Sequence, residues 1–126
     1  MDIPKRDARL VVARTITNVL GESHRRYFPK LKLPRAVEAT TVLFAILIAE
    51  AEGKPRNELG LAKRLQMSRQ TMGRRLKDIE ATGMIRREGR LIRLAGTKFA
   101  TPSGDAAIRR VSQLIIDAAK ALSEIA

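Results

Sequence analysis

The spacing of apolar side chains predicts a mainly helical chain that carries one short β-hairpin. Apolar residues recur at steps of three and four between positions 5 and 26, the spacing that lines one face of an α-helix. Pro29 and Pro34 interrupt this pattern, and a second helix is predicted from about Pro34 to Glu52. Because the second helix is apolar on nearly all sides, it should be buried against more than one neighbour.

Two short helices joined by a tight turn are predicted between Asn57 and Ile79. Asn57 can cap the first helix, and Gln66 with Met67 forms the turn, in which Met67 points inward. Ser68 is a good N-cap for the second helix, because its hydroxyl oxygen can accept a bond from an unpaired amide of the first turn. The inward-facing residues of the two helices are Leu61, Ala62, Leu65, Met72, Leu76 and Ile79.

A β-hairpin is predicted directly after this pair of helices. Gly83 stands where helices commonly end in a glycine, and a strand follows from Met84 and Ile85. Glu88 and Gly89 are the expected two-residue turn. The return strand carries Leu91, Ile92 and Leu94, and residues 95 to 100 connect it to the last helix.

The last helix is predicted from Thr101, as N-cap, and Pro102, at the first helical position, to about Glu124. Apolar residues along it alternate steps of three and four, which is the seam of a heptad repeat. We expect this seam to join two copies of the chain, with help from the first helix. Pairing of the two terminal helices within one chain is the alternative. The seam residues are Ile108, Val111, Ile115, Ala118, Leu122 and Ile125.

The charge of the chain is concentrated on the helix pair and hairpin. A chain of 126 residues fits one domain, with an N-terminal arm (1–30), a core (35–96) and a C-terminal dimerisation helix (101–126). The net charge is +12, which favours a polyanionic partner, most simply nucleic acid. Residues 53–98 hold 13 Lys and Arg against 4 Asp and Glu, so +9 of the charge lies there. A solvated basic face without a partner is the alternative interpretation.

The second helix of the pair and the hairpin supply the candidate nucleic-acid contacts. A DNA major groove admits one α-helix, whose N-terminal residues reach base edges, and Arg and Gln can bond bases in bidentate fashion. Hairpin arginines beside a turn can reach phosphates or the minor groove, although charge on an edge strand also prevents aggregation. The candidates are Ser68, Arg69, Gln70, Thr71 and Arg74 for bases, Arg75 and Lys77 for phosphates, and Arg87 and Arg90 in the hairpin.

No pattern indicates an enzyme, a cofactor or a metal site. The chain has no cysteine, and its single histidine, His24, has no cluster of ligands around it, so it is expected at a surface or helix end. No catalytic triad, carboxylate pair or phosphate-binding glycine loop is present. The most apolar run, residues 39–49, is too short to cross a membrane, and a cytoplasmic location is expected.

The helix pair and hairpin together resemble the winged-helix DNA-binding domains of bacterial transcription regulators. The order of the surrounding elements extends the resemblance loosely to the MarR family. The hairpin departs from that family in being short and in lacking its acidic-x-Arg pattern, and Gln66 replaces a frequent glycine. The residues that carry the resemblance are Leu61, Ala62, Leu65, Met67, Ser68, Met72, Leu76, Glu80, Gly83, Met84 and Ile85.

The resemblance implies a sequence-specific regulator that binds double-stranded DNA as a homodimer, most simply a repressor that blocks a promoter. It also implies that a small-molecule effector could bind between the dimer helices and the DNA-binding part, although no polar cluster identifies one. The alternatives are a non-specific architectural or replication-associated DNA-binding protein and a winged helix that binds another protein. The charge of +9 on the motif argues against the latter.

Overall fold

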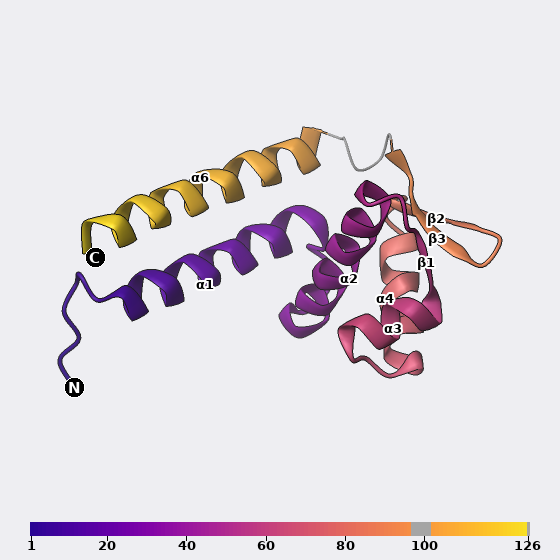
Figure 1. Ribbon diagram of the computed structural model, residues 1–126, viewed down its shortest axis with the longest axis horizontal. Helices are drawn as coiled ribbons and strands as arrows, with labels where there is room; N and C mark the ends of the chain where they lie inside the picture. The colour runs from indigo at the N-terminus through magenta and orange to yellow at the C-terminus, as the bar shows by residue number, and fades with distance from the viewer. Residues whose placement is uncertain (97–101, 126) are drawn as a thin grey trace.

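The computed structural model describes residues 1–96 and 102–125, and side chains for 1–96 and 106–125. It is mainly helical with a small three-stranded antiparallel sheet, which confirms that part of the predicted fold class. Figure 1 shows the arrangement of the elements. In chain order they are α1 (Ala8–Tyr27), α2 (Leu33–Ala51), β1 (Arg56–Asn57), α3 (Glu58–Leu65), α4 (Arg69–Glu80), β2 (Ile85–Glu88), β3 (Leu91–Leu94) and α6 (Pro102–Ile125).

Side-chain caps mark the starts of α1, α3 and α4. Asn57 Oδ1 accepts a hydrogen bond from Gly60 N at 2.7 Å, and Ser68 Oγ accepts one from Thr71 N at 3.0 Å, so both predicted caps are confirmed. The predicted start of α1 at residue 5 is wrong by three positions, because Asp7 is its cap. The predicted cap Thr101 lies outside the described residues, as does most of the predicted connector.

Helix α2 is the centre of the hydrophobic core. It packs against α1, α3, α4 and β3, so the prediction that it is buried on several sides is confirmed. Val42, Leu43 and Ile46 of α2 are almost completely buried. From α3 and α4 the core receives Leu61, Ala62, Met72, Leu76 and Ile79, all at predicted inward positions, and Leu65 and Met67 pack at its edge.

The sheet has the strand order β1-β3-β2, and its edge strand β1 was not predicted. The predicted turn at Glu88–Gly89 is displaced by one residue. Glu88 pairs with Leu91, which leaves Gly89 and Arg90 as the two-residue loop. Gly89 has a φ of +61°, as a glycine at the first position of a type II′ turn requires.

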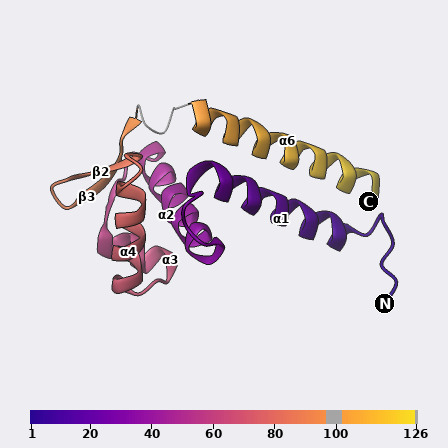
Figure 2. The same ribbon diagram turned by 180° about the vertical axis from the view of Figure 1, so that it is seen from behind.

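Helices α1 and α6 lie side by side and antiparallel, and they extend away from the other elements, as both views show (Figures 1 and 2). The structure therefore has the intramolecular pairing of the terminal helices that was the alternative at the sequence level. The residues of the predicted seam divide between two sides of α6. Ala118 lies beside Val11 of α1, as does Leu114, which is not a seam residue. Ile108 and Ile115 are 42% and 55% exposed within the chain, and their role in joining two copies stays a prediction.

One carboxylate of α2 holds the hairpin in place. Glu50 Oε1 accepts hydrogen bonds from Arg93 Nε at 2.7 Å and from Leu94 N at 3.0 Å, and Glu50 Oε2 accepts one from Arg93 Nη2 at 3.1 Å. The Arg93 guanidinium, more than the backbone amide of Leu94, holds the pKa of Glu50 below its ordinary value of 4.5. The orientation of the hairpin relative to the core therefore depends on an ionised Glu50.

Glu50→Gln should make the fold less stable at neutral pH and less sensitive to acid. A carboxylate with a lowered pKa contributes stability above its unfolded-state pKa and loses that contribution as the pH falls through the folded-state value. Urea unfolding at neutral pH and at about pH 3 should show a smaller loss of unfolding free energy for the variant than for the wild type. Glu52→Gln, at an exposed position just beyond α2, is the control. Identical pH dependence in Glu50→Gln and the wild type would contradict the prediction.

Candidate nucleic-acid interface

The solvent-facing side of α4 is a stripe of polar side chains. Burial of Met72, Leu76 and Ile79 against the core turns the opposite side of the helix outward. Gln70, Arg74 and Lys77 are exposed there at helical spacing, four and three residues apart. At the helix start Ser68 and Arg69 are exposed too, although the Ser68 hydroxyl serves as the cap. Thr71 is half-buried, and its hydroxyl accepts a hydrogen bond from Ser68 Oγ at 3.0 Å.

Arg75 does not lie on this exposed stripe, and its predicted outward position is wrong. Its side chain is only 7% exposed, because it falls on the core side of α4 between Met72 and Ile79. Arg75 Nη1 donates to Glu38 Oε1 at 2.8 Å, and its Nε lies 3.0 Å from Asp78 Oδ2. Arg75 therefore joins α4 to α2, and its guanidinium is held by these carboxylates at the edge of the helix rather than on the exposed stripe.

A basic hollow borders the exposed stripe of α4 on the side of α2. It is lined by Arg35, Arg74, Lys77, Arg75 and Asp78. Arg35 is exposed in the first turn of α2, and its Nη2 donates to Asp78 Oδ1 at 3.2 Å.

Sequence reasoning missed Arg35 as a site residue. Arg35 precedes Arg74 by 39 positions, and only the packing of α4 on α2 brings the two side chains to one hollow. The sequence did contain one signal, because Arg35 lies at the start of the helix that was expected to pack on the helix pair. No spacing rule, however, relates Arg35 to α4. The hollow thus adds one cation to the predicted set.

A second basic hollow borders α4 on the side of the hairpin. Three of the predicted site residues line it together: Arg69 of α4, and Arg87 and Arg90 of the hairpin. Asn57, Glu58, Leu59 and Gly89 complete its lining. The structure therefore brings the start of α4 and the tip of the hairpin to one surface, although the two are about 20 residues apart in sequence.

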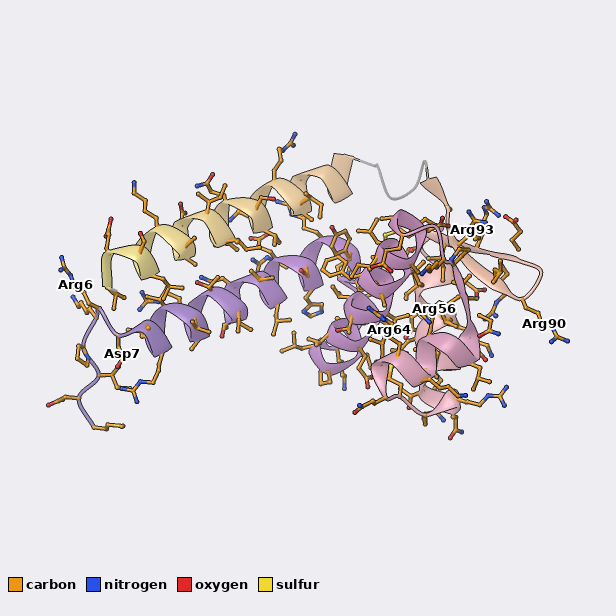
Figure 3. All side chains as sticks on the ribbon, viewed as in Figure 1. Arg6, Asp7, Arg56, Arg64, Arg90 and Arg93 are labelled. Atoms are coloured by element: carbon orange, nitrogen blue, oxygen red, sulfur yellow. The ribbon has the colours of Figure 1, made fainter. Side chains whose placement is uncertain are left out.

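The two hairpin arginines differ in how they are held. Arg87 Nε donates to Glu80 Oε1 at 2.8 Å, and Arg87 Nη2 lies 3.5 Å from Glu58 Oε1, so carboxylates of α4 and α3 orient this side chain. Arg90 projects from the end of the hairpin, away from the rest of the molecule (Figure 3). Arg87 is thus pre-positioned beside α4, whereas Arg90 reaches outward.

Gly73 lies on the flank of α4 nearest Glu58 of α3. Glycine in a helix interior costs about 1 kcal/mol relative to alanine. A Cβ added at Gly73 would meet only Glu58 Oε1, at an ordinary contact distance of 3.8 Å. Packing inside the protein therefore does not require a glycine here.

His24 lies at a helix end, as predicted. It lies in the last turn of α1, and its Nε2 is 2.6 Å from the carbonyl oxygen of Leu31, which ties the end of α1 to the loop before α2. Among the side chains of residues 1–96 and 106–125, no group of three or more His, Cys, Asp or Glu could hold a metal ion. None of the described helices combines the length and apolarity needed to span a membrane.

Comparison of the chain with protein-family models, curated proteins and solved structures finds no match. The functional argument therefore depends on the surface itself. That surface is one exposed polar helix face with a cluster of cationic side chains on each side.

Arg75→Ala should destabilise the fold, whereas Arg74→Ala should not. Removing Arg75 leaves Glu38 and Asp78 without their shared cation, and hydrogen bonds to charged groups contribute about 1.5–3 kcal/mol. Arg74 is exposed, and such substitutions usually change stability by about 0.5 kcal/mol or less. Urea unfolding of both variants measures the difference. Equal stabilities would contradict the structural role of Arg75.

Proposed function

We propose that this protein is a sequence-specific, double-stranded DNA-binding transcription regulator of the winged-helix type that acts as a homodimer. Helix α4 would be the recognition helix, and the β2–β3 hairpin would be a short wing. The observation that carries the proposal is the pair of basic hollows on the two sides of the exposed face of α4. The charge of +9 on residues 53–98 adds to it.

The pair of hollows matches what a helix meets in a major groove. The groove is bordered by two phosphodiester strands, so an inserted helix has phosphates on both sides and base edges in front of it. Arg35 and Lys77 would neutralise phosphates on one side of α4. On the other side Arg69, Arg87 and Arg90 would do the same, with Arg90 at the reach of the minor groove.

Base recognition would come from two exposed residues of the α4 stripe, Gln70 between the hollows and Arg74 at the hollow beside α2. Gln70 can form two hydrogen bonds with adenine, and Arg74 can form two with guanine. Both side chains are exposed in the middle of the stripe. A surface that bound phosphates alone would not need a planar amide at this position, so Gln70 favours sequence-specific binding over an architectural role.

Repression by occupying a promoter in the cytoplasm is the simplest regulatory mechanism for such a protein. A glycine at position 73 fits this function, because a helix flank without a Cβ allows the backbone to approach a ligand closely. The similarity to the MarR family at the sequence level leaves room for a small-molecule effector, whose identity the described surface does not indicate.

In vitro selection from a random duplex library tests the proposal. At about 0.15 M salt, where screening moderates simple charge attraction, the protein should enrich an inverted repeat. Two recognition helices related by a two-fold axis read half-sites about 10 base pairs apart. Binding without enrichment would replace the proposal with a non-specific architectural function. Absence of binding would remove DNA as the partner.

Arg74→Ala should weaken binding to the selected sequence by about 1–3 kcal/mol and relax the preference at one base position. Arg64→Ala is the matched control, because Arg64 is exposed on α3 and lines neither hollow (Figure 3). Titrations against the selected duplex and a scrambled duplex distinguish a base contact by Arg74 from a phosphate contact. If Arg74→Ala weakened binding to both duplexes equally, Arg74 would be a phosphate contact instead.

A further inference from the structure

Helix α4 carries two carboxylates, and each of them holds an arginine of another element. Asp78 Oδ1 accepts a hydrogen bond from Arg35 Nη2 of α2 at 3.2 Å, and Glu80 Oε1 accepts one from Arg87 Nε of β2 at 2.8 Å. The two arginines line the two hollows on opposite sides of the exposed stripe. A carboxylate repels a polyanion at such a surface, so its presence there requires a gain that offsets the repulsion.

The pleat of the hairpin turns Arg87 toward α4. Successive residues of a strand point to opposite sides of the sheet, so Arg87 shares a side with Ile85 and with its cross-strand partner Ile92. Both isoleucines are buried in the core. Arg87 continues this inward side toward the end of the hairpin, where it meets Glu80 and Glu58. Its position beside α4 therefore follows from the register of the hairpin.

The two carboxylates hold Arg87 along one flank of α4. Glu80 and Gly73 lie on the same flank, since the seven residues between these positions make about two helical turns. A Cβ at position 73 would lie 3.8 Å from Glu58 Oε1, so Glu58 reaches this flank from α3. Arg87 Nη2 lies 3.5 Å from the same oxygen. The guanidinium is thus held from two directions beside the exposed stripe.

An arginine held in this way keeps donors for a partner. A guanidinium has five N–H groups. Glu80 accepts from Nε and Glu58 from one N–H of Nη2, which leaves three of the five. The Arg87 side chain is 44% exposed, so a partner can reach it. Arg87 can therefore bind one phosphate in a direction that the two carboxylates determine.

The charges of this group favour placement over attraction. Arg87 with Glu58 and Glu80 carries a net charge of −1, because one cation meets two carboxylates. Such a group adds little to the general affinity for a polyanion. Phosphate contacts also fix the register and orientation of a protein on a duplex. A guanidinium in one constant position suits this second role.

We infer that Glu80 is a positioning residue for DNA recognition, which holds Arg87 against a single phosphate and so sets the register of α4 in the groove. In that register Gln70 and Arg74 meet their bases. The inference rests on the proposed function, and it assigns to Glu80 a gain in sequence specificity at a cost in affinity.

Glu80 is a better residue to test than Asp78, which has the corresponding place on the other flank. Asp78 also holds the buried Arg75, so its substitution would disturb the packing of α4 on α2. Glu80 pairs with Arg87 alone among the described residues, and its side chain is 35% exposed. Substitution of Glu80 therefore changes the placement of Arg87 without removing a contact of the core.

Binding of Glu80→Ala to the selected duplex and to a scrambled duplex tests the inference. The specificity ratio is the dissociation constant for the scrambled duplex divided by that for the selected one. Glu80→Ala should lower this ratio by about 10-fold, which corresponds to about 1.4 kcal/mol. Binding to the scrambled duplex should be equal or tighter, because a negative charge is lost. Urea unfolding verifies that each variant is folded.

Glu88→Ala is the control of matched charge. Glu88 belongs to the same hairpin but follows Arg87 in the strand, so it points to the other side of the sheet, where it pairs with Arg86 and Arg93. Its removal should affect both duplexes by the same factor and leave the specificity ratio unchanged. If Glu80→Ala behaved like Glu88→Ala, the role of Glu80 would be one of charge alone, and the inference would be overturned.

A double variant tests whether Glu80 acts through Arg87. Arg87→Ala should lower the specificity ratio about as much as Glu80→Ala does, and the two substitutions together should lower it no further. A further loss in the double variant would overturn the inference. If Glu80→Ala does not fold, Arg87→Lys takes its place. It keeps the charge but loses the planar fork, so it should also lower the ratio, and an unchanged ratio would contradict the inference.

The same titrations separate this inference from the proposed function. A wild type that prefers the selected duplex, with an equal preference in Glu80→Ala, would remove the inference and leave the proposed function standing. A wild type that binds both duplexes equally, or neither, would remove sequence-specific recognition and the role of Glu80 with it.

Discussion

The packing of α4 on α2 determines which cationic side chains are available to a partner. Met72, Leu76 and Ile79 must face the core, and this requirement sets the rotation of the helix. Arg75 then falls on the buried side, where Glu38 of α2 and Asp78 hold it. Asp78 in turn holds Arg35, so a chain of four charged groups links the two helices. This linkage keeps the exposed stripe of α4 and the start of α2 in a constant relative position.

The acidic residues of the basic segment divide its arginines into two groups. All four carboxylates between residues 53 and 98 form ion pairs: Glu58 and Glu80 with Arg87, Asp78 with Arg35 and Arg75, and Glu88 with Arg86 and Arg93. Arg69, Arg74, Lys77 and Arg90 have no ion pair among the described residues. The net charge of this segment does not distinguish cationic side chains in ion pairs from those outside them. These four side chains line the hollows beside α4, whereas the other cations of the segment that lack an ion pair, Lys54, Arg56, Lys63 and Arg64, line neither hollow.

Local signals in the sequence predicted most of the elements, and long-range contacts account for the failures. Asn57 and Ser68 cap helices through bonds within three residues, so their roles follow from sequence alone. Arg75 recurs at helical spacing with Met72 and Ile79, but its partner Glu38 is 37 positions away. Strand β1 has two residues, too few for a periodic pattern. In α6, two neighbouring sets of apolar residues both have the spacing of a heptad seam. Only contact with α1 decides which of the two sets is buried.

Two surfaces at opposite ends of the molecule bear on the proposed homodimer. The pair of α1 and α6 extends to one end, while α4 and the hairpin lie at the other (Figure 2). Exposed apolar residues lie on the first surface, and cationic side chains lie on both sides of the second. Repulsion between two cationic chains falls off over about 8–10 Å in physiological salt. Contact through the apolar end therefore keeps most of the positive charge of two copies apart, and it leaves both α4 helices open to a polyanion.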